Sequence, residues 1–87
     1  MDFLHYVKRA AITLHRRSVN AGLDNRGFTS SQLVLQVREE NFKSFLSPDS
    51  IHKAVARLYS DGLLHIDADT GIYTCSIKLL EQFEVAV

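Results

Sequence analysis

The segment from Ser47 to Gly62 carries the clearest helix signals in the chain and constrains what precedes and follows it. Ser47 is a preferred N-cap residue, Pro48 suits the first helical position, and Asp49 puts a negative charge in the first turn. Gly62 is the residue type that ends a helix in the left-handed conformation. The sequence therefore predicts a helix over residues 47–61. Its buried face is predicted from four apolar residues at helical spacing: Ile51, Ala54, Val55 and Leu58.

An earlier segment, residues 2–21, has apolar residues at every third or fourth position, a spacing that predicts an amphipathic helix. Gly22 follows it as a typical helix end. The side chains predicted to face the core are Phe3, Val7, Ala10, Ala11, Leu14, Ser18 and Ala21. Those predicted to lie toward the opposite side are Lys8, Arg9, His15 and Arg16.

Another helix is predicted to begin at Thr29. Thr29 as N-cap and Gln32 three residues later form a capping box, in which each side chain accepts a hydrogen bond from the other residue's backbone. Phe28 and Leu33 have the spacing of a hydrophobic staple across this cap. The buried face is predicted to consist of Leu33, Val34 and Val37, and the charged end of Arg38, Glu39 and Glu40 is expected in solvent.

After Gly62 the pattern changes from helical spacing to short β-rich runs. Residues 63–67 and 72–76 predict two strands, and the loop between them carries Gly71 where a positive φ is needed. Residues 77–87 predict a short amphipathic helix, with a strand as the alternative for this end of the chain.

Three helices, a two-stranded hairpin and a closing helix thus follow one another. This order resembles the winged helix-turn-helix superfamily. The resemblance runs from Phe28 to Thr74, and it includes the run from Val55 to Leu64, where a recognition helix ends at a glycine before the first wing strand. It implies an α+β, mostly α fold: a winged helix-turn-helix with three helices, a two-stranded β-hairpin wing and a short C-terminal helix. This fold is expected as a single domain over residues 1–87.

The resemblance implies DNA binding by a small transcriptional regulator, with the helix over residues 47–61 in the major groove. The exposed face of this helix has short polar residues near its start, and Lys and Arg side chains along it suit bases and phosphates. Two further cations, Arg38 and Lys43, flank the link into this helix and are expected at the DNA backbone. The predicted DNA-binding residues are Ser47, Asp49, Ser50, His52, Lys53, Arg57, Arg38 and Lys43. In the alternative interpretation, these residues contact no DNA: the exposed face of the helix is simply solvated, and Ser47, Pro48 and Asp49 only stabilise the start of the helix.

The charge balance favours a second interpretation. Ten Lys and Arg against ten Asp and Glu give a net charge of zero, whereas proteins held to DNA by electrostatics alone are usually basic. Nine of the ten cations but only five of the ten acids lie in the first 57 residues, so the charges are partly segregated. The predicted wing tip, residues 69–71, has no cation to hold a minor groove. The alternative function is therefore protein binding. In this interpretation the chain is a winged-helix module that acts as an adaptor or anti-regulator and does not bind nucleic acid.

A second set of apolar residues lies off the main core stripe. These side chains either complete one core or form a two-fold dimer through the first and last helices. A homodimer would place two copies of the 47–61 helix about one DNA turn apart, roughly 34 Å. The residues predicted for the dimer interface are Leu4, Ile12, Val19, Leu79, Leu80 and Phe83.

Several classes of function are not indicated. The histidines, Asp67 and Cys75 lack the close ligand spacing of zinc sites, so no metal site is expected. The sequence has no nucleophile elbow or phosphate loop, so we expect neither an enzyme nor a bound cofactor. No stretch approaches the roughly 18 apolar residues of a membrane span, and the first residues lack the pattern of a secretory signal. Together with a single cysteine, these features predict a cytoplasmic protein.

Overall fold

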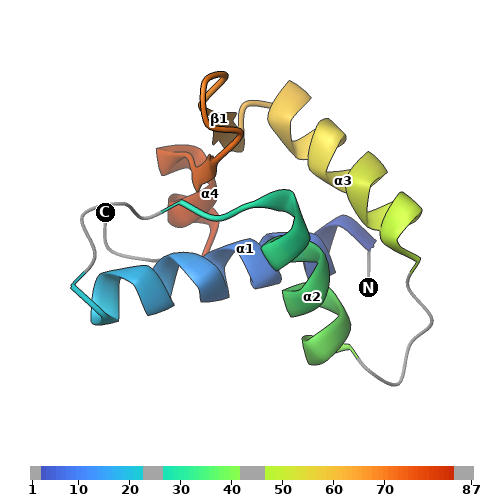
Figure 1. Cartoon of the computed structure of the whole chain (residues 1–87), viewed down its shortest axis with the longest axis horizontal. Coiled ribbons are helices and arrows are strands. Elements are labelled where there is room, and N and C mark those ends of the chain that lie inside the picture. Colours follow the sequence, from blue (N-terminus) through green and yellow to red (C-terminus); the bar gives the residue numbers. More distant parts are fainter. Residues whose placement is uncertain (1–2, 23–26, 42–46, 84–87) are drawn as a thin grey trace.

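The computed structural model describes residues 3–22, 27–41 and 47–83, and over these residues the chain is mostly helical. Its elements are α1 (Phe3–Asn20), α2 (Ser30–Glu40), α3 (Pro48–Ser60), β1 (Leu64–Ile66), β2 (Tyr73–Cys75) and α4 (Ile77–Gln82). Both α2 and α3 pack against α1, and the β1–β2 hairpin follows α3 (Figure 1). The predicted α+β class, mostly helical with an antiparallel hairpin, is therefore confirmed. Within the described ranges, no helix is long and apolar enough to cross a bilayer.

The predicted helix starts depend on side-chain caps, and the structure contains these caps. The Gln32 N–H donates to Thr29 Oγ1 at 3.1 Å, and the Thr29 N–H donates to Gln32 Oε1 at 2.8 Å, which completes the capping box. At the start of α3, Ser47 Oγ accepts from the Ser50 N–H at 3.2 Å. At its end, Gly62 has the left-handed φ of 77° that suits a glycine C-cap. These local bonds set where α2 and α3 begin and where α3 ends.

α1 buries a wider face than the sequence predicts. Ile12 and His15 are only 2% and 5% exposed, although both were expected away from the core stripe. The reason is that α1 contacts α2, α3 and β2, so neighbouring elements cover more than one stripe of it. Ser18 is half-buried, as are Phe3 and Leu14 of the same predicted stripe. Ala21 is exposed beyond the end of the helix, so the predicted stripe was wrong at this position.

The β1–β2 hairpin also pairs with a third backbone segment, at Phe28, which the sequence pattern did not indicate. β1 pairs with β2 in antiparallel register, with Leu64 opposite Cys75 and Ile66 opposite Tyr73. On the other side of β2, the Phe28 N–H donates to the Tyr73 carbonyl at 2.9 Å, and the Tyr73 N–H donates to the Phe28 carbonyl at 2.8 Å. Their two rings stack with centroids 6.5 Å apart. Phe28 therefore ties the segment before α2 to the hairpin.

α4 closes the core from the end of the hairpin. Its N-cap Ser76 is buried, and Ser76 Oγ accepts from the Leu79 N–H at 3.3 Å. Leu79 and Leu80 are buried with the other core residues. At its C-cap, the Phe83 ring stacks on His5 of α1 with centroids 5.7 Å apart. Of the longer helix predicted for this end of the chain, the last four residues lie outside the described ranges.

Replacing Phe28 tests the link between α2 and the hairpin. Phe28→Ala is expected to lower the free energy of unfolding by about 3 kcal/mol, because it empties a buried ring site and removes the stack on Tyr73. Urea unfolding followed by circular dichroism measures the change. Val19→Ala, at a side chain that is 40% exposed, is the control and is expected within about 0.5 kcal/mol of the parent. Equal effects of the two substitutions would contradict this role of Phe28.

Candidate nucleic-acid interface

α3 has the two faces that the sequence predicts. Its inward residues Ile51, Ala54, Val55 and Leu58 are buried in the core. Its outward residues are exposed, and they include Asp49, Ser50, His52, Lys53, Ala56 and Arg57. Tyr59 is also an outward residue, with 53% of its surface exposed. The face that a partner could reach is therefore mainly polar and carries both Lys53 and Arg57.

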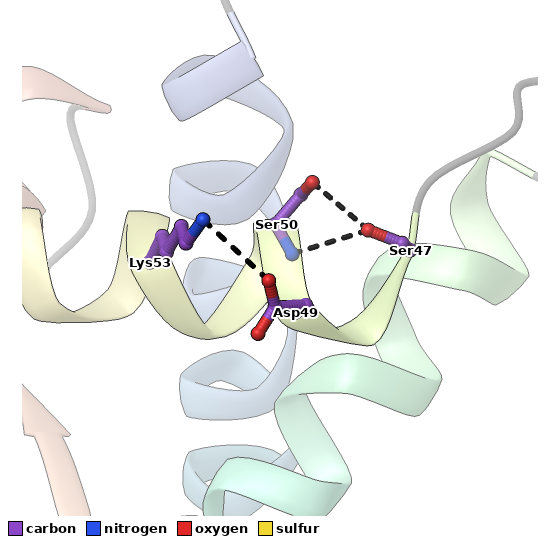
Figure 2. Close-up of polar contacts among 4 residues, drawn as sticks. All are labelled: Ser47, Asp49, Ser50 and Lys53. Atoms are coloured by element: carbon purple, nitrogen blue, oxygen red, sulfur yellow. Dashed lines mark hydrogen bonds and ion pairs between the residues drawn. The ribbon is translucent and has the colours of Figure 1, made fainter.

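Each cation on this face has an acidic partner one helical turn away. Lys53 Nζ lies 3.5 Å from Asp49 Oδ2, and Arg57 Nε lies 3.2 Å from Asp61 Oδ2. Figure 2 shows the Lys53 side chain turned back along the helix toward Asp49. The Lys53 and Arg57 side chains are 80% and 67% exposed, and such exposed i,i+4 pairs contribute only about 0.3–0.5 kcal/mol. Either cation can therefore exchange its carboxylate for a phosphate at little cost.

The other predicted DNA-binding residues differ in how freely they can act. Ser47 is half-buried and serves as the N-cap, and its hydroxyl also donates to Ser50 Oγ at 2.9 Å (Figure 2). Ser50 and His52 are exposed on α3, and Arg38 is exposed in the last turn of α2. Lys43 lies outside the described residues. The outward face therefore offers Ser50 as its exposed hydroxyl, whereas Ser47 is half-buried and serves as the N-cap.

A groove of about 590 Å³ runs between the start of α1 and α3. One side consists of Phe3 and Leu4 from the first turn of α1. The α3 side consists of Ser47, Ser50, Lys53, Ala54 and Arg57. Sequence reasoning missed this groove because it depends on how two distant helices cross. It lies along the same stripe of α3 that carries the two cations.

A polar seam joins α1 to α2, and we define it as Thr13, Arg17, Gln36 and Glu40. Thr13 Oγ1 donates to Glu40 Oε2 at 2.8 Å, and Arg17 Nη1 donates to Gln36 Oε1 at 2.9 Å. Gln36 is buried, and its amide also donates to Glu40 Oε2 at 3.3 Å. Glu40 was expected in solvent, but it is half-buried because it accepts these bonds. The seam therefore orients α2 on α1.

The predicted dimer residues have three different environments. Ile12, Leu79 and Leu80 lie in the core of the single chain, with at most 2% of their surfaces exposed. Their assignment to a dimer interface is therefore corrected: they complete one core because α1 is covered on several sides. Leu4 and Phe83 are half-buried against this core. Val19 is the member of the predicted set that is largely exposed.

The cysteine and histidine side chains do not form a ligand cluster. Among the described residues, no three His, Cys, Asp or Glu side chains are placed to hold a metal ion. Cys75 Sγ donates instead to the Ala11 carbonyl at 3.5 Å, and burial raises the pKa of this thiol from 9.0 to about 12. A thiol that stays protonated is a poor nucleophile and a poor metal ligand. Cys75 therefore acts as a packing residue between β2 and α1.

The predicted site residues on α3 lie together because they share one face of one helix, with Arg38 separate at the end of α2. Neither the models of known protein families, nor the curated proteins, nor the solved structures give a match to this chain.

The Cys75 environment predicts slow alkylation. At about pH 8 the folded chain should react with iodoacetamide at least about 100-fold more slowly than the urea-unfolded chain, because the thiolate is the reactive form. Since the folded pKa is raised, the free energy of unfolding should also fall as pH rises from 9.0 toward about 12. The control carries Cys75→Ala with Ser60→Cys, an exposed thiol on α3. Equal rates for folded Cys75 and this control would show that the thiol is not protected.

Proposed function

We propose that the chain is a winged helix-turn-helix domain that binds double-stranded DNA, as a small cytoplasmic transcriptional regulator. The observation that carries this proposal is the outward face of α3, where Ser50, Lys53 and Arg57 project away from a fully packed inner face. A helix of this kind suits the major groove, in which hydroxyl and cationic side chains contact base edges and phosphates.

The arrangement of the other elements supports the proposal. α2 and α3 both rest on α1, so α3 is held at the surface while its inner face is buried (Figure 1). The hairpin begins just after Gly62 ends α3, which is the chain order expected for a wing. Phe28 pairs with Tyr73 and adds a backbone segment to the other side of β2. This order of elements is the one expected of a winged helix.

The electrostatics point to modest affinity that depends strongly on salt. The chain has no net charge, so attraction must come from local cations rather than from the whole molecule. On α3 these are Lys53 and Arg57, whose weak ion pairs yield easily to phosphate. Arg38, an exposed cation in the last turn of α2, is proposed to add a contact with the DNA backbone. A homodimer would double these contacts, and Val19 is an exposed apolar residue that it could use.

A protein-binding module is the second candidate function, and two observations favour it. The acids Asp49 and Asp61 neutralise the α3 cations within the same helix. In addition, Tyr59 on α3 and Leu35 on α2 are 53% and 65% exposed, which suits an interface with a protein better than one with phosphate. A lack of DNA binding at low salt would select this candidate.

Fluorescence anisotropy with random and selected duplexes tests DNA binding. The chain should bind, and its affinity should fall steeply between about 50 mM and about 200 mM salt. Lys53→Ala with Arg57→Ala should weaken binding by about tenfold or more and lower the slope of log affinity against log salt by about 2. The melting temperature should be unchanged, since both side chains are exposed.

The matched control removes the same charge from α1, with Arg9→Ala and Arg16→Ala at two exposed positions. It should bind like the parent chain. Conversely, Asp49→Asn with Asp61→Asn should tighten binding, because it frees both α3 cations from their acidic partners. No binding of the parent to any duplex at low salt, or equal losses in the α1 and α3 variants, would overturn the proposal.

A further inference from the structure

The groove between α1 and α3 follows one stripe of α3 and has an apolar side. Along α3 it follows Ser47, Ser50, Lys53 and Arg57, which are three or four residues apart and so share one stripe. Ten residues of helix make this stripe roughly 15 Å long. The apolar surface comes mainly from the half-buried Phe3 and Leu4 on α1, and the largely buried Ala54 on α3 adds little to it. Its volume of about 590 Å³ is that of a small-molecule site.

Among the described residues, the charged side chains that line this groove are the two cations Lys53 and Arg57. Lys53 and Arg57 line it, whereas their acidic partners Asp49 and Asp61 are not among its lining residues in the described part of the chain. Both cationic side chains are largely exposed and weakly paired, so each can turn toward an anion in the groove. The groove therefore combines an apolar surface with two cations and the hydroxyl of Ser50.

We propose that this groove binds a small amphiphile with a single anionic group, of the chemical class of a medium-chain carboxylate. The hydrocarbon chain lies on Phe3 and Leu4, and the carboxylate pairs with Lys53 and Arg57. A polyanion without an apolar part leaves the α1 side of the groove uncovered, and a cationic amphiphile meets two like charges. The complementary ligand is therefore both apolar and anionic.

Occupation of the groove also affects the outward face of α3. The ligand and DNA both need Ser50, Lys53 and Arg57. Bound carboxylate therefore lowers the affinity for DNA, a consequence that rests on the proposed function. Through this competition, an apolar acid would release the domain from DNA.

The binding site is tested with sodium decanoate, below its micelle concentration, in amide NMR spectra of the full chain. Saturable shifts are expected at Phe3, Leu4 and the α3 stripe, and decyltrimethylammonium, with the same chain and opposite charge, should not produce them. Lys53→Gln with Arg57→Gln should weaken decanoate binding by about tenfold or more.

A second pair of variants separates occupation of the groove from general apolar binding. Ser50→Leu fills the groove and should abolish the decanoate shifts, whereas Ser60→Leu adds the same side chain at an exposed position of α3 outside it. Shifts spread over exposed apolar residues such as Leu35 and Ile77, or equal binding of the cationic amphiphile, would overturn the site.

The competition is tested on the parent chain bound to a labelled duplex. Decanoate should release the DNA with a midpoint that follows the affinity measured by NMR, and sodium acetate at the same concentration controls for salt. If decanoate fills the groove without releasing DNA, the proposed competition is wrong, but the proposed binding of decanoate in the groove remains supported. If the chain never binds DNA, the proposed function fails, while the NMR arm still decides whether the groove holds the ligand.

Discussion

The packing of α1 against the rest of the chain is the constraint on which the structure depends. Val7, Ala10 and Ala11 have no exposed surface, and the two alanines let neighbouring elements come close to the helix backbone. One such contact comes from β2, where Cys75 Sγ donates to the Ala11 carbonyl at 3.5 Å. Because α2, α3 and β2 all contact α1, the position of α3 at the surface follows from how α1 is covered.

Polar contacts then select one arrangement among those that apolar packing alone would allow. The seam of Thr13, Arg17, Gln36 and Glu40 crosses from α1 to α2, and its bonds form only in one register of the two helices. Phe28 does the same for the hairpin through its paired bonds with Tyr73. With α2 and the hairpin held in this way, α3 presents a single outward face, and the proposed function depends on that face.

The sequence could predict what is decided locally. The starts of α2 and α3 were predicted correctly because Thr29, Gln32 and Ser47 make their capping bonds within three residues. The ion pair between Asp49 and Lys53 could also have been predicted from the sequence, because the two residues are four positions apart on one helix. The sequence analysis assigned Asp49 to the helix start and to the DNA-binding residues, and it did not predict the pairing with Lys53.

The remaining features depend on contacts between distant segments. His15 is buried because several elements surround α1, and no periodicity in α1 alone reveals how many neighbours it has. The bridge at Phe28 involves one residue and therefore has no repeating pattern. The groove beside Phe3 and Lys53 likewise exists only because α1 and α3 cross. The sequence thus identified the cationic residues of the α3 face, but it could not show the groove beside them.

The most direct test of the central claim is an NMR titration of the labelled full chain with a DNA duplex at low salt. The account predicts that the largest amide shifts occur on the outward face of α3, at residues such as Ser50, Lys53 and Arg57, with smaller shifts near Arg38. Residues around Arg9 and Arg16 on α1 should be unaffected. Shifts centred on α1, or no shifts at any DNA concentration, would contradict the claim that α3 is a DNA-binding surface.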